Sequence, residues 1–181
     1  MPPLRINAEN ENITHFLTLT IIEWIDIFTK PAYFKIIIES LKFCQAKKGL
    51  KLFEFVILTN HLHLIAKAKD GRKLSQIISD FKKYTTREIL KELQKDNRRY
   101  ILNLIANSFS KKIGYENQIW QRENYPEVII SEEFLREKIN YIHNNPVKKG
   151  CVSLPEHWRY SSARNDILND SSLIELDDIW E

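Results

Sequence analysis

Alternating hydrophobic and polar positions predict three strands in the first part of the chain. Residues 14–22 alternate threonine with apolar side chains, a period of two that is typical of a half-buried strand. Residues 51–59 and 61–67 are rich in β-branched and aromatic side chains, and Thr59 and Asn60 stand at their junction. Because asparagine tolerates the backbone of a tight turn, these two segments predict a β-hairpin.

Apolar residues that recur at a helical period predict two helices around this hairpin. Residues 31–48 carry one such stripe, with Pro31 suited to a first helical turn and Gly49 suited to the end of the helix. Residues 74–93 carry a longer stripe. Basic side chains lie largely off this second stripe, at Lys82, Lys83 and Arg87.

The second half of the chain is less regular. Residues 95–118 mix charged and apolar positions, and we expect a short helix or an insertion there. A third helix begins after Ser131, a capping residue followed by an acidic first turn, and is expected to end at or before Pro146. From Gly150 onward we expect a loop with a short helix. Strands and helices in this order predict an α+β fold, an antiparallel sheet with helices packed on it.

The composition excludes several classes of protein. The 181 residues are 43% hydrophobic and 11% aromatic, with four glycines and six prolines, which excludes disordered and low-complexity chains. No run approaches the roughly 18 apolar residues of a membrane helix, and residues 1–5 lack the apolar stretch of a signal peptide. Two cysteines form neither a disulfide framework nor a zinc cluster. We therefore expect a soluble protein of a reducing, intracellular compartment that does not bind membranes.

Charge is distributed unevenly along the chain. Residues 67–149 contain 18 Lys and Arg against 11 Asp and Glu, whereas residues 150–181 contain 2 against 7. A basic middle with an acidic flank suits a protein that binds a polyanion such as nucleic acid. The same pattern also describes the uneven solvation of an ordinary surface, so that charge alone leaves both interpretations open.

The stretch NHLHL offers a pair of metal-binding side chains. In a strand, residues i and i+2 point to the same face, so His61 and His63 would be neighbours with Cα atoms about 6.5–7 Å apart. Leu62 and Leu64 would then face the helices. Two imidazoles at this separation can bind one divalent ion if a third ligand comes from elsewhere. The alternative is two surface histidines on the polar face of an amphipathic strand.

Tyr141 and Asn145 lie four residues apart in the third predicted helix and therefore share one of its faces. That face lies beside the buried stripe, whereas His143 points to the opposite side and is a poor candidate for the same site. A helix docked on the sheet could present the tyrosine hydroxyl and the amide oxygen to one point. Alternatively, Tyr141 packs its ring at the boundary of the core and Asn145 ends the helix.

These side chains together could cleave a phosphodiester. A tyrosine hydroxyl has a pKa of about 10 and is a weak nucleophile until a metal ion polarises the phosphate. Two histidines and an asparagine supply neutral donors, which suit Mg²⁺ or Mn²⁺ better than a structural zinc. Attack by Tyr141 would keep the bond energy in a phosphotyrosine, so that strand joining needs no ATP.

Five segments, in order, resemble the single-tyrosine HUH transposases, in which a hydrophobic residue separates two histidines, and more closely their REP-associated tyrosine transposase branch. The segments are VILTNHLHLI at 56–65, FKKYT at 81–85, IWQRENY at 119–125, YIHNNPVKKG at 141–150 and WRYSSA at 158–163. The resemblance covers residues 13–165, which we expect to form one domain. A flexible N-terminal segment at 1–12 and an acidic C-terminal tail at 166–181 would flank it.

The resemblance implies a ferredoxin-like fold with the histidine pair on a central strand. It implies that His61, His63 and Asn145 bind Mg²⁺ or Mn²⁺, and that Tyr141 forms a 5′-phosphotyrosine with single-stranded DNA beside a hairpin or palindromic repeat. It further implies a cytoplasmic, nucleoid-associated protein of a bacterium. Some relatives exchange the tyrosine helix between two copies, so the resemblance leaves a monomer or a homodimer open. Thr59 replaces a proline that is frequent in the family, and the second tyrosine, Tyr125, ranks below Tyr141.

Contacts to DNA phosphates are expected from the basic middle of the chain. The candidates are Lys82, Lys83, Lys111, Lys112, Arg122, Lys148 and Lys149. Trp120 and Tyr115 could stack on unpaired bases, although Trp120 could equally pack in the core. Two other functions stay open: a non-catalytic module that binds DNA or RNA hairpins without metal, and a metal-dependent nuclease in which water is the nucleophile.

Overall fold

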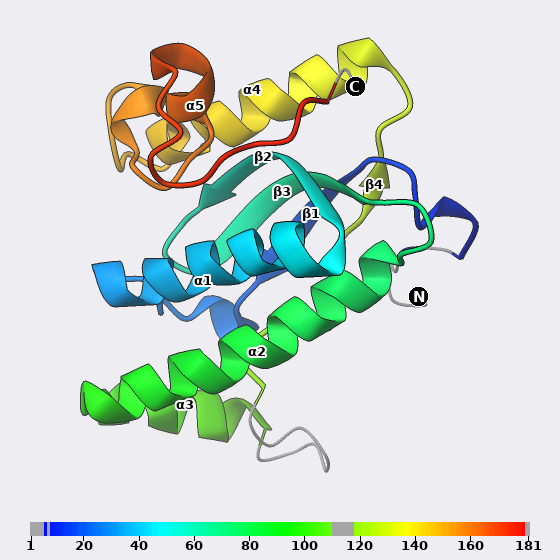
Figure 1. Cartoon of the computed structure of the whole chain (residues 1–181). Coiled ribbons are helices and arrows are strands. Elements are labelled where there is room, and N and C mark those ends of the chain that lie inside the picture. The colour runs from blue at the N-terminus through cyan, green and yellow to red at the C-terminus, as the bar shows by residue number, and fades with distance from the viewer. Residues whose placement is uncertain (1–5, 7, 110–117, 180–181) are drawn as a thin grey trace.

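The computed structural model describes residue 6 and residues 8–109 and 118–179. Within them, the antiparallel strands β1 (His15–Thr20), β2 (Leu50–Ile57), β3 (His61–Ala68) and β4 (Glu127–Val128) form one sheet in the order β2-β3-β1-β4. Helices α1 (Pro31–Phe43) and α2 (Leu74–Lys95) cover one face, and α4 (Glu132–Lys148) covers the other (Figure 1). The predicted α+β, ferredoxin-like fold with the histidine pair on a central strand is confirmed.

The predicted hairpin is formed by β2 and β3. The backbone N–H of Leu58 donates to the carbonyl of His61 (2.8 Å) and closes the turn. Asp26 holds the turn from outside, because one of its carboxylate oxygens accepts from Thr59 Oγ1 (2.6 Å) and from Asn60 Nδ2 (2.8 Å). In the family that the sequence resembles, this position is often a proline. Here Thr59 contributes a hydrogen bond to Asp26 instead.

The helices of the first half begin where the sequence predicts, and α2 extends two residues beyond its predicted apolar stripe, to Lys95. Helix α1 begins at Pro31, and a π-helical turn, η3 (Cys44–Lys48), extends it to Gly49, whose φ of 79° lies in the left-handed region that favours glycine. The expected short helix in the 95–118 segment is α3 (Arg99–Phe109), and residues 110–117 lie outside the described residues. The other short helices are η1 (Ala8–Asn10), η2 (Ile22–Trp24), η4 (Pro155–His157) and α5 (Ala163–Leu168).

The prediction that the third helix ends at or before Pro146 is wrong, because α4 continues to Lys148. Proline removes its own backbone donor, which would have bonded to the carbonyl of Ile142, but the helix ends two residues later, so the loss disturbs no further turn. The chain then closes the last turn compactly. The carbonyl of Asn145 accepts from Lys149 N (3.0 Å), and the carbonyl of Pro146 accepts from Cys151 N (2.9 Å). Ser131 caps the other end of α4 as predicted, accepting from Phe134 N.

Each face of the sheet has its own hydrophobic cluster in the described part of the chain. The larger cluster joins the inward residues of β1 and β3, such as Leu17 and Leu62, to α1 and α2. The smaller cluster lies between the sheet and α4. Its buried members are Phe16, Phe53, Val56, Leu58, Ile65, Leu135 and Ile142. Helix α4 therefore rests on the sheet through a small apolar contact.

The chain that follows α4 covers the outer edge of β2. Ser162 N donates to the carbonyl of Phe55 (2.9 Å), and Asp177 both donates its backbone N–H to Leu52 O (2.8 Å) and accepts from Leu52 N through its carboxylate (2.9 Å). An edge strand without such partners would expose a row of backbone groups. Across the described ranges, no helix is both long and apolar enough to cross a bilayer.

Candidate active site

The two histidines of β3 lie on the face of the sheet that carries α4. Leu62 and Leu64 point into the larger hydrophobic cluster, so the alternation of a strand turns His61 and His63 to the opposite face. Both rings are buried, at 5% and 4% exposure, so the alternative interpretation as surface histidines is wrong. Their ring centroids are 5.0 Å apart at an angle of 76°. Two nitrogens that bind one ion at about 2 Å each lie within about 4 Å of one another, which this spacing allows.

Hydrogen bonds orient both imidazoles through the same ring nitrogen. His61 Nδ1 bonds Asn60 Oδ1 (2.7 Å), and His63 Nδ1 bonds Thr18 Oγ1 (2.9 Å). An imidazole that donates through Nδ1 keeps a lone pair on Nε2, and such a bond also fixes the ring plane, as is usual for metal-binding histidines. Sequence reasoning missed Thr18, because its pairing opposite His63 depends on the register between β1 and β3.

Asn145 and His63 each bury a polar atom that has no hydrogen-bond partner. In the described residues, the buried side-chain atoms without a partner are His63 Nε2, Asn145 Oδ1 and Asn124 Oδ1. Leaving such an atom unpaired costs about 1–3 kcal/mol, so the fold keeps these atoms only if something else satisfies them. A nitrogen and an amide oxygen that both lack a proton suit a cation, so the donors present fit a divalent ion.

Tyr141, Asn145 and Lys149 follow one another at intervals of four residues, which puts Asn145 on the side of α4 that faces the histidine pair; Lys149 comes directly after the last residue of the helix. The Tyr141 ring lies edge-on to the His63 ring, with centroids 5.1 Å apart. Two turns further along, the charge of Lys149 acts on both His61 and His63. Asn145 stands between these two positions on the same face of the helix and is itself buried.

The site keeps its histidines in the neutral form that binds metal. Burial lowers the pKa of His61 to about 4, and the nearby charge of Lys149 adds to this effect. Burial lowers the pKa of His63 to about 3, together with the charges of His61, Lys138 and Lys149. Near neutral pH both rings are therefore uncharged, and a cation need not displace a proton from them.

Tyr141 combines contact with the histidine pair and access to solvent. Its side chain is 40% exposed, while its ring packs edge-on against Phe16 as well as His63. The Lys148 ammonium lies 5.8 Å from the ring centroid. The Tyr141 ring therefore lies beside the His63 ring of its own chain. A phenol held in this way can approach a phosphate that arrives from solvent.

The predicted DNA-binding residues lie in different environments. Lys149 is exposed near the histidines, and Lys148 is exposed beside the Tyr141 ring. Lys82, Lys83 and Arg122 line a shallow cavity of about 310 Å³ between α2 and the segment before β4. Lys82 is half-buried, donates to the carbonyl of Gln121 (2.7 Å), and has a pKa that burial lowers to about 8. The candidates Lys111, Lys112 and Tyr115 lie outside the described residues.

Trp120 is a core residue, so the expectation that its ring could stack on bases is wrong. It is 3% exposed and packs against Phe28 and Phe81. Its indole N–H donates to Thr85 Oγ1 (3.0 Å) within α2. The sequence could not tell base stacking from core packing, because a tryptophan in such a segment faces either solvent or the core, depending on what packs over it.

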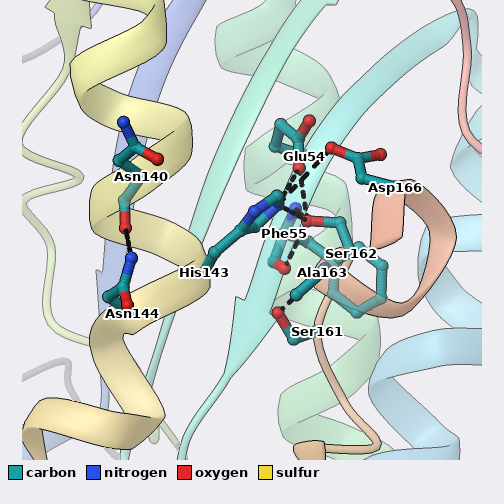
Figure 2. A network of polar contacts seen from close by, with 9 residues as sticks. All are labelled: Glu54, Phe55, Asn140, His143, Asn144, Ser161, Ser162, Ala163 and Asp166. Atoms are coloured by element: carbon teal, nitrogen blue, oxygen red, sulfur yellow. Dashed lines mark hydrogen bonds and ion pairs between the residues drawn. The ribbon is translucent and has the colours of Figure 1, made fainter. Parts of the chain in front are cut away.

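His143 takes no part in the histidine site, as its position on the helix predicts. It is buried on the other side of α4, where its Nε2 donates to Glu54 Oε2 (3.0 Å) (Figure 2). Ligand atoms of Glu54, His143 and Asp166 lie within 4.8 Å of one another. The histidine and Glu54 already satisfy one another directly, so an ion could enter only by breaking that bond.

Comparisons with known proteins agree on one family. A family model described as "Transposase IS200 like" matches residues 14–145. A curated protein of Haemophilus influenzae (strain ATCC 51907 / DSM 11121 / KW20 / Rd), named "Putative REP-associated tyrosine transposase", is 30% identical over 112 residues. This match covers 61% of the chain but only 57% of the relative's length.

A solved structure of a REP-associated tyrosine transposase bound to a REP hairpin is similar over nearly the whole chain. The alignment covers 98% of this chain and 91% of that one, with a TM-score of 0.69 and 20% sequence identity. At this identity the likeness shows a common fold.

Proposed function

The chain belongs to the family of IS200-like transposases, and we propose that it nicks and rejoins single-stranded DNA through a 5′-phosphotyrosine on Tyr141. We further propose that His61, His63 and Asn145 hold the divalent cation that the reaction needs. The family membership supports a DNA-processing enzyme. The residue roles and the metal are our proposal, and they rest on the chemistry of the side chains around the histidine pair.

One observation carries the proposal. His63 Nε2 and Asn145 Oδ1 are buried without a hydrogen-bond partner. The phenol of Tyr141, which solvent can reach, lies edge-on to the His63 ring. A site that served only to bind DNA would have no reason to bury two unpaired acceptors, each of which costs about 1–3 kcal/mol. A cation between them removes that cost.

The donors are neutral, and this decides which cation suits them. Two imidazoles and one amide cancel none of the charge of a divalent ion, which leaves it free to attract phosphate oxygens. Mg²⁺ and Mn²⁺ accept such mixed nitrogen and oxygen donors and keep open positions for substrate and water. When bound, the cation would polarise the scissile phosphate and stabilise the charge that develops on its oxygens.

In the reaction that we propose, the Tyr141 oxygen attacks phosphorus and loses its proton. The bond from phosphorus to the 3′ oxygen of the preceding nucleotide breaks, and that oxygen leaves as a free 3′-hydroxyl after taking up a proton. The 5′ end of the other strand segment is then esterified to Tyr141. A 3′-hydroxyl can attack this phosphotyrosine in the reverse sense, which rejoins a strand and restores the phenol.

We propose a DNA hairpin, or single-stranded DNA beside one, as the substrate, because the solved structure with a similar fold is described as bound to a REP hairpin. Lys148 and Lys149 stand next to the nucleophile and would hold the strand that reaches Tyr141. Lys83 and Arg122 would contact phosphates further away, from the cavity beside α2. Tyr141 meets His63 of its own chain, which favours a nucleophile that acts without a second copy.

A denaturing gel tests this proposal directly. Wild-type protein, incubated with Mn²⁺ and an oligonucleotide that carries a hairpin, should covalently retain the label of a 3′-labelled strand and release the label of a 5′-labelled strand. The adduct should vanish with EDTA and with Tyr141→Phe, whereas hairpin affinity should change by less than about threefold. Cleavage without an adduct would identify water as the nucleophile. Binding without cleavage would identify a non-catalytic module, and either result would overturn the proposal.

A further inference from the structure

A β-bulge turns the acidic side chain of Glu54, in β2, towards α4. Leu52 pairs with Ala66 of β3, but Glu54 pairs with Ile65, so that Phe53 is the extra residue. Phe53 lies in the cluster beneath α4, and the Glu54 carboxylate reaches His143 on the same side. Bulges commonly re-aim a side chain near functional sites. Here the bulge places a carboxylate under an otherwise apolar helix contact.

Glu54 is the centre of a buried network that joins β2, α4 and the segment leading into α5 (Figure 2). Its Oε2 accepts from His143 Nε2 (3.0 Å) and from the hydroxyl of Ser162. Ser162 Oγ in turn accepts from Phe55 N (3.1 Å), which ties the network to the backbone of β2. Asp166 Oδ2 lies 3.6 Å from His143 Nε2, and burial together with Glu54 raises the pKa of Asp166 to about 6.

This network is the directional part of the contact between α4 and β2. The cluster beneath α4 consists of apolar side chains, with Leu135 and Ile142 contributed by the helix. Apolar contacts tolerate small rotations and slides, because they depend on area and volume and not on angle. A hydrogen-bonded pair requires one distance and one direction. His143 stands two residues from Tyr141 and two from Asn145, so a rotation of the helix would move both.

We propose that Glu54, Ser162 and His143 form a positioning network, assisted by Asp166. This network fixes the rotation of α4 about its axis and its distance from the sheet, so that Tyr141 and Asn145 meet the histidine pair. His143 is thus a positioning residue for a reaction in which it touches neither metal nor DNA. The inference rests on the proposed function, because its consequence is the rate at which Tyr141 attacks. The network also makes the C-terminal segment part of the active-site scaffold.

The test replaces the polar pair by apolar side chains of similar size. The double variant His143→Leu with Glu54→Leu removes both buried polar groups at once, which often leaves stability unchanged. Since a displacement of about 1 Å can cost about a hundredfold in rate, the single-turnover rate of adduct formation at saturating DNA and Mn²⁺ should fall about a hundredfold. The DNA concentration that gives half the maximal rate should stay within about twofold, because the DNA-binding lysines are untouched.

Two control variants separate positioning from stability. Leu135→Ala removes apolar contact from the same helix far from the network, so it should lower the melting temperature and yet keep the wild-type rate. Glu54→Gln keeps an acceptor for His143 and should retain most of the rate. If the double variant does not fold, His143→Asn, whose amide is too short to reach Glu54, takes its place and must show the same loss.

The outcomes distinguish this inference from the function on which it rests. A double variant, or its substitute, that forms adduct at the wild-type rate would overturn the positioning network. A rate that falls in Leu135→Ala as much as in the double variant would also overturn it, since stability alone would then explain the loss. Wild-type protein without any adduct would refute the proposed function itself.

Discussion

Replacing Asn145 by leucine should make the metal-free protein more stable while abolishing its response to metal. Asn145 buries a carbonyl oxygen that has no partner, and a buried unpaired acceptor costs about 1–3 kcal/mol. Leucine has the same number of side-chain heavy atoms with the same branching and no polar atom, so Asn145→Leu should raise the unfolding free energy by about that amount in EDTA. For a chain of this size we expect the melting temperature to rise by roughly 3–9 °C.

Metal should stabilise the wild-type protein and leave the stability of Asn145→Leu unchanged. A ligand that binds only the folded state stabilises it by about 2.7 kcal/mol at a hundred times its dissociation constant. Wild-type protein should therefore melt at higher temperature in Mn²⁺ than in EDTA, whereas Asn145→Leu should melt at the same temperature in both. Thermal melts followed by circular dichroism, with a titration of Mn²⁺, measure both effects in one set of samples.

The neighbouring residue provides a matched control. Asn144 lies on the same helix turn but is less buried, and its Nδ2 donates to the carbonyl of Asn140 (3.0 Å). Asn144→Leu should leave the stability within about 0.5 kcal/mol and keep the full shift with Mn²⁺. If Asn145→Leu destabilises the metal-free protein, or if it still responds to Mn²⁺ as the wild type does, the assignment of Asn145 as a ligand is refuted.

Three further predictions follow from the same contacts. Trp120→Phe loses the bond to Thr85 and should lower the unfolding free energy by about 1–2 kcal/mol in urea, without changing hairpin affinity; weaker binding at unchanged stability would contradict its core role. Burial lowers the pKa of Lys82 to about 8, against about 10.4 in an unfolded chain, so the unfolded state binds more protons between these values. The unfolding free energy should therefore rise by a few kcal/mol from pH 8 to pH 10, and this rise should be missing in Lys82→Met; a parallel pH dependence in both proteins would exclude Lys82 as its cause. Replacing Lys148 and Lys149 together by glutamine should reduce the slope of log binding constant against log salt by about 1–2, and an unchanged slope would remove both lysines from the DNA interface.

Local periodicity was sufficient to predict most of the elements. The structure contains the strands predicted from the alternation in 14–22 and 61–67 and the helix predicted from the apolar stripe in 74–93. Burial of one face of an element imposes a period on its sequence, which is why these predictions succeeded. The failure at Pro146 arose from treating proline as a stop, whereas α4 loses that one donor and still continues for two more residues. The resemblance to a transposase family is confirmed by the family model.

The pairing of His61 with His63, and of Tyr141 with Asn145, could also be read from the sequence, because each pair is spaced by the period of its own element. Which of them are buried could not be read. That Nε2 of His63 and Oδ1 of Asn145 lie without partners depends on how closely α4 packs on the sheet. The same packing decided that Trp120 belongs to the core.

The chain by itself therefore determined the elements, the spacing within each element and the kinds of donor that it could offer. The tertiary structure decided which of those donors come together. Thr18 meets His63 only through the register between β1 and β3, and Glu54 meets His143 only because a bulge shifts the register between β2 and β3 by one residue. Such contacts join positions 45 and 89 residues apart in the chain. Short-range periodicity carries no information about them, because they depend on how whole elements pack against one another.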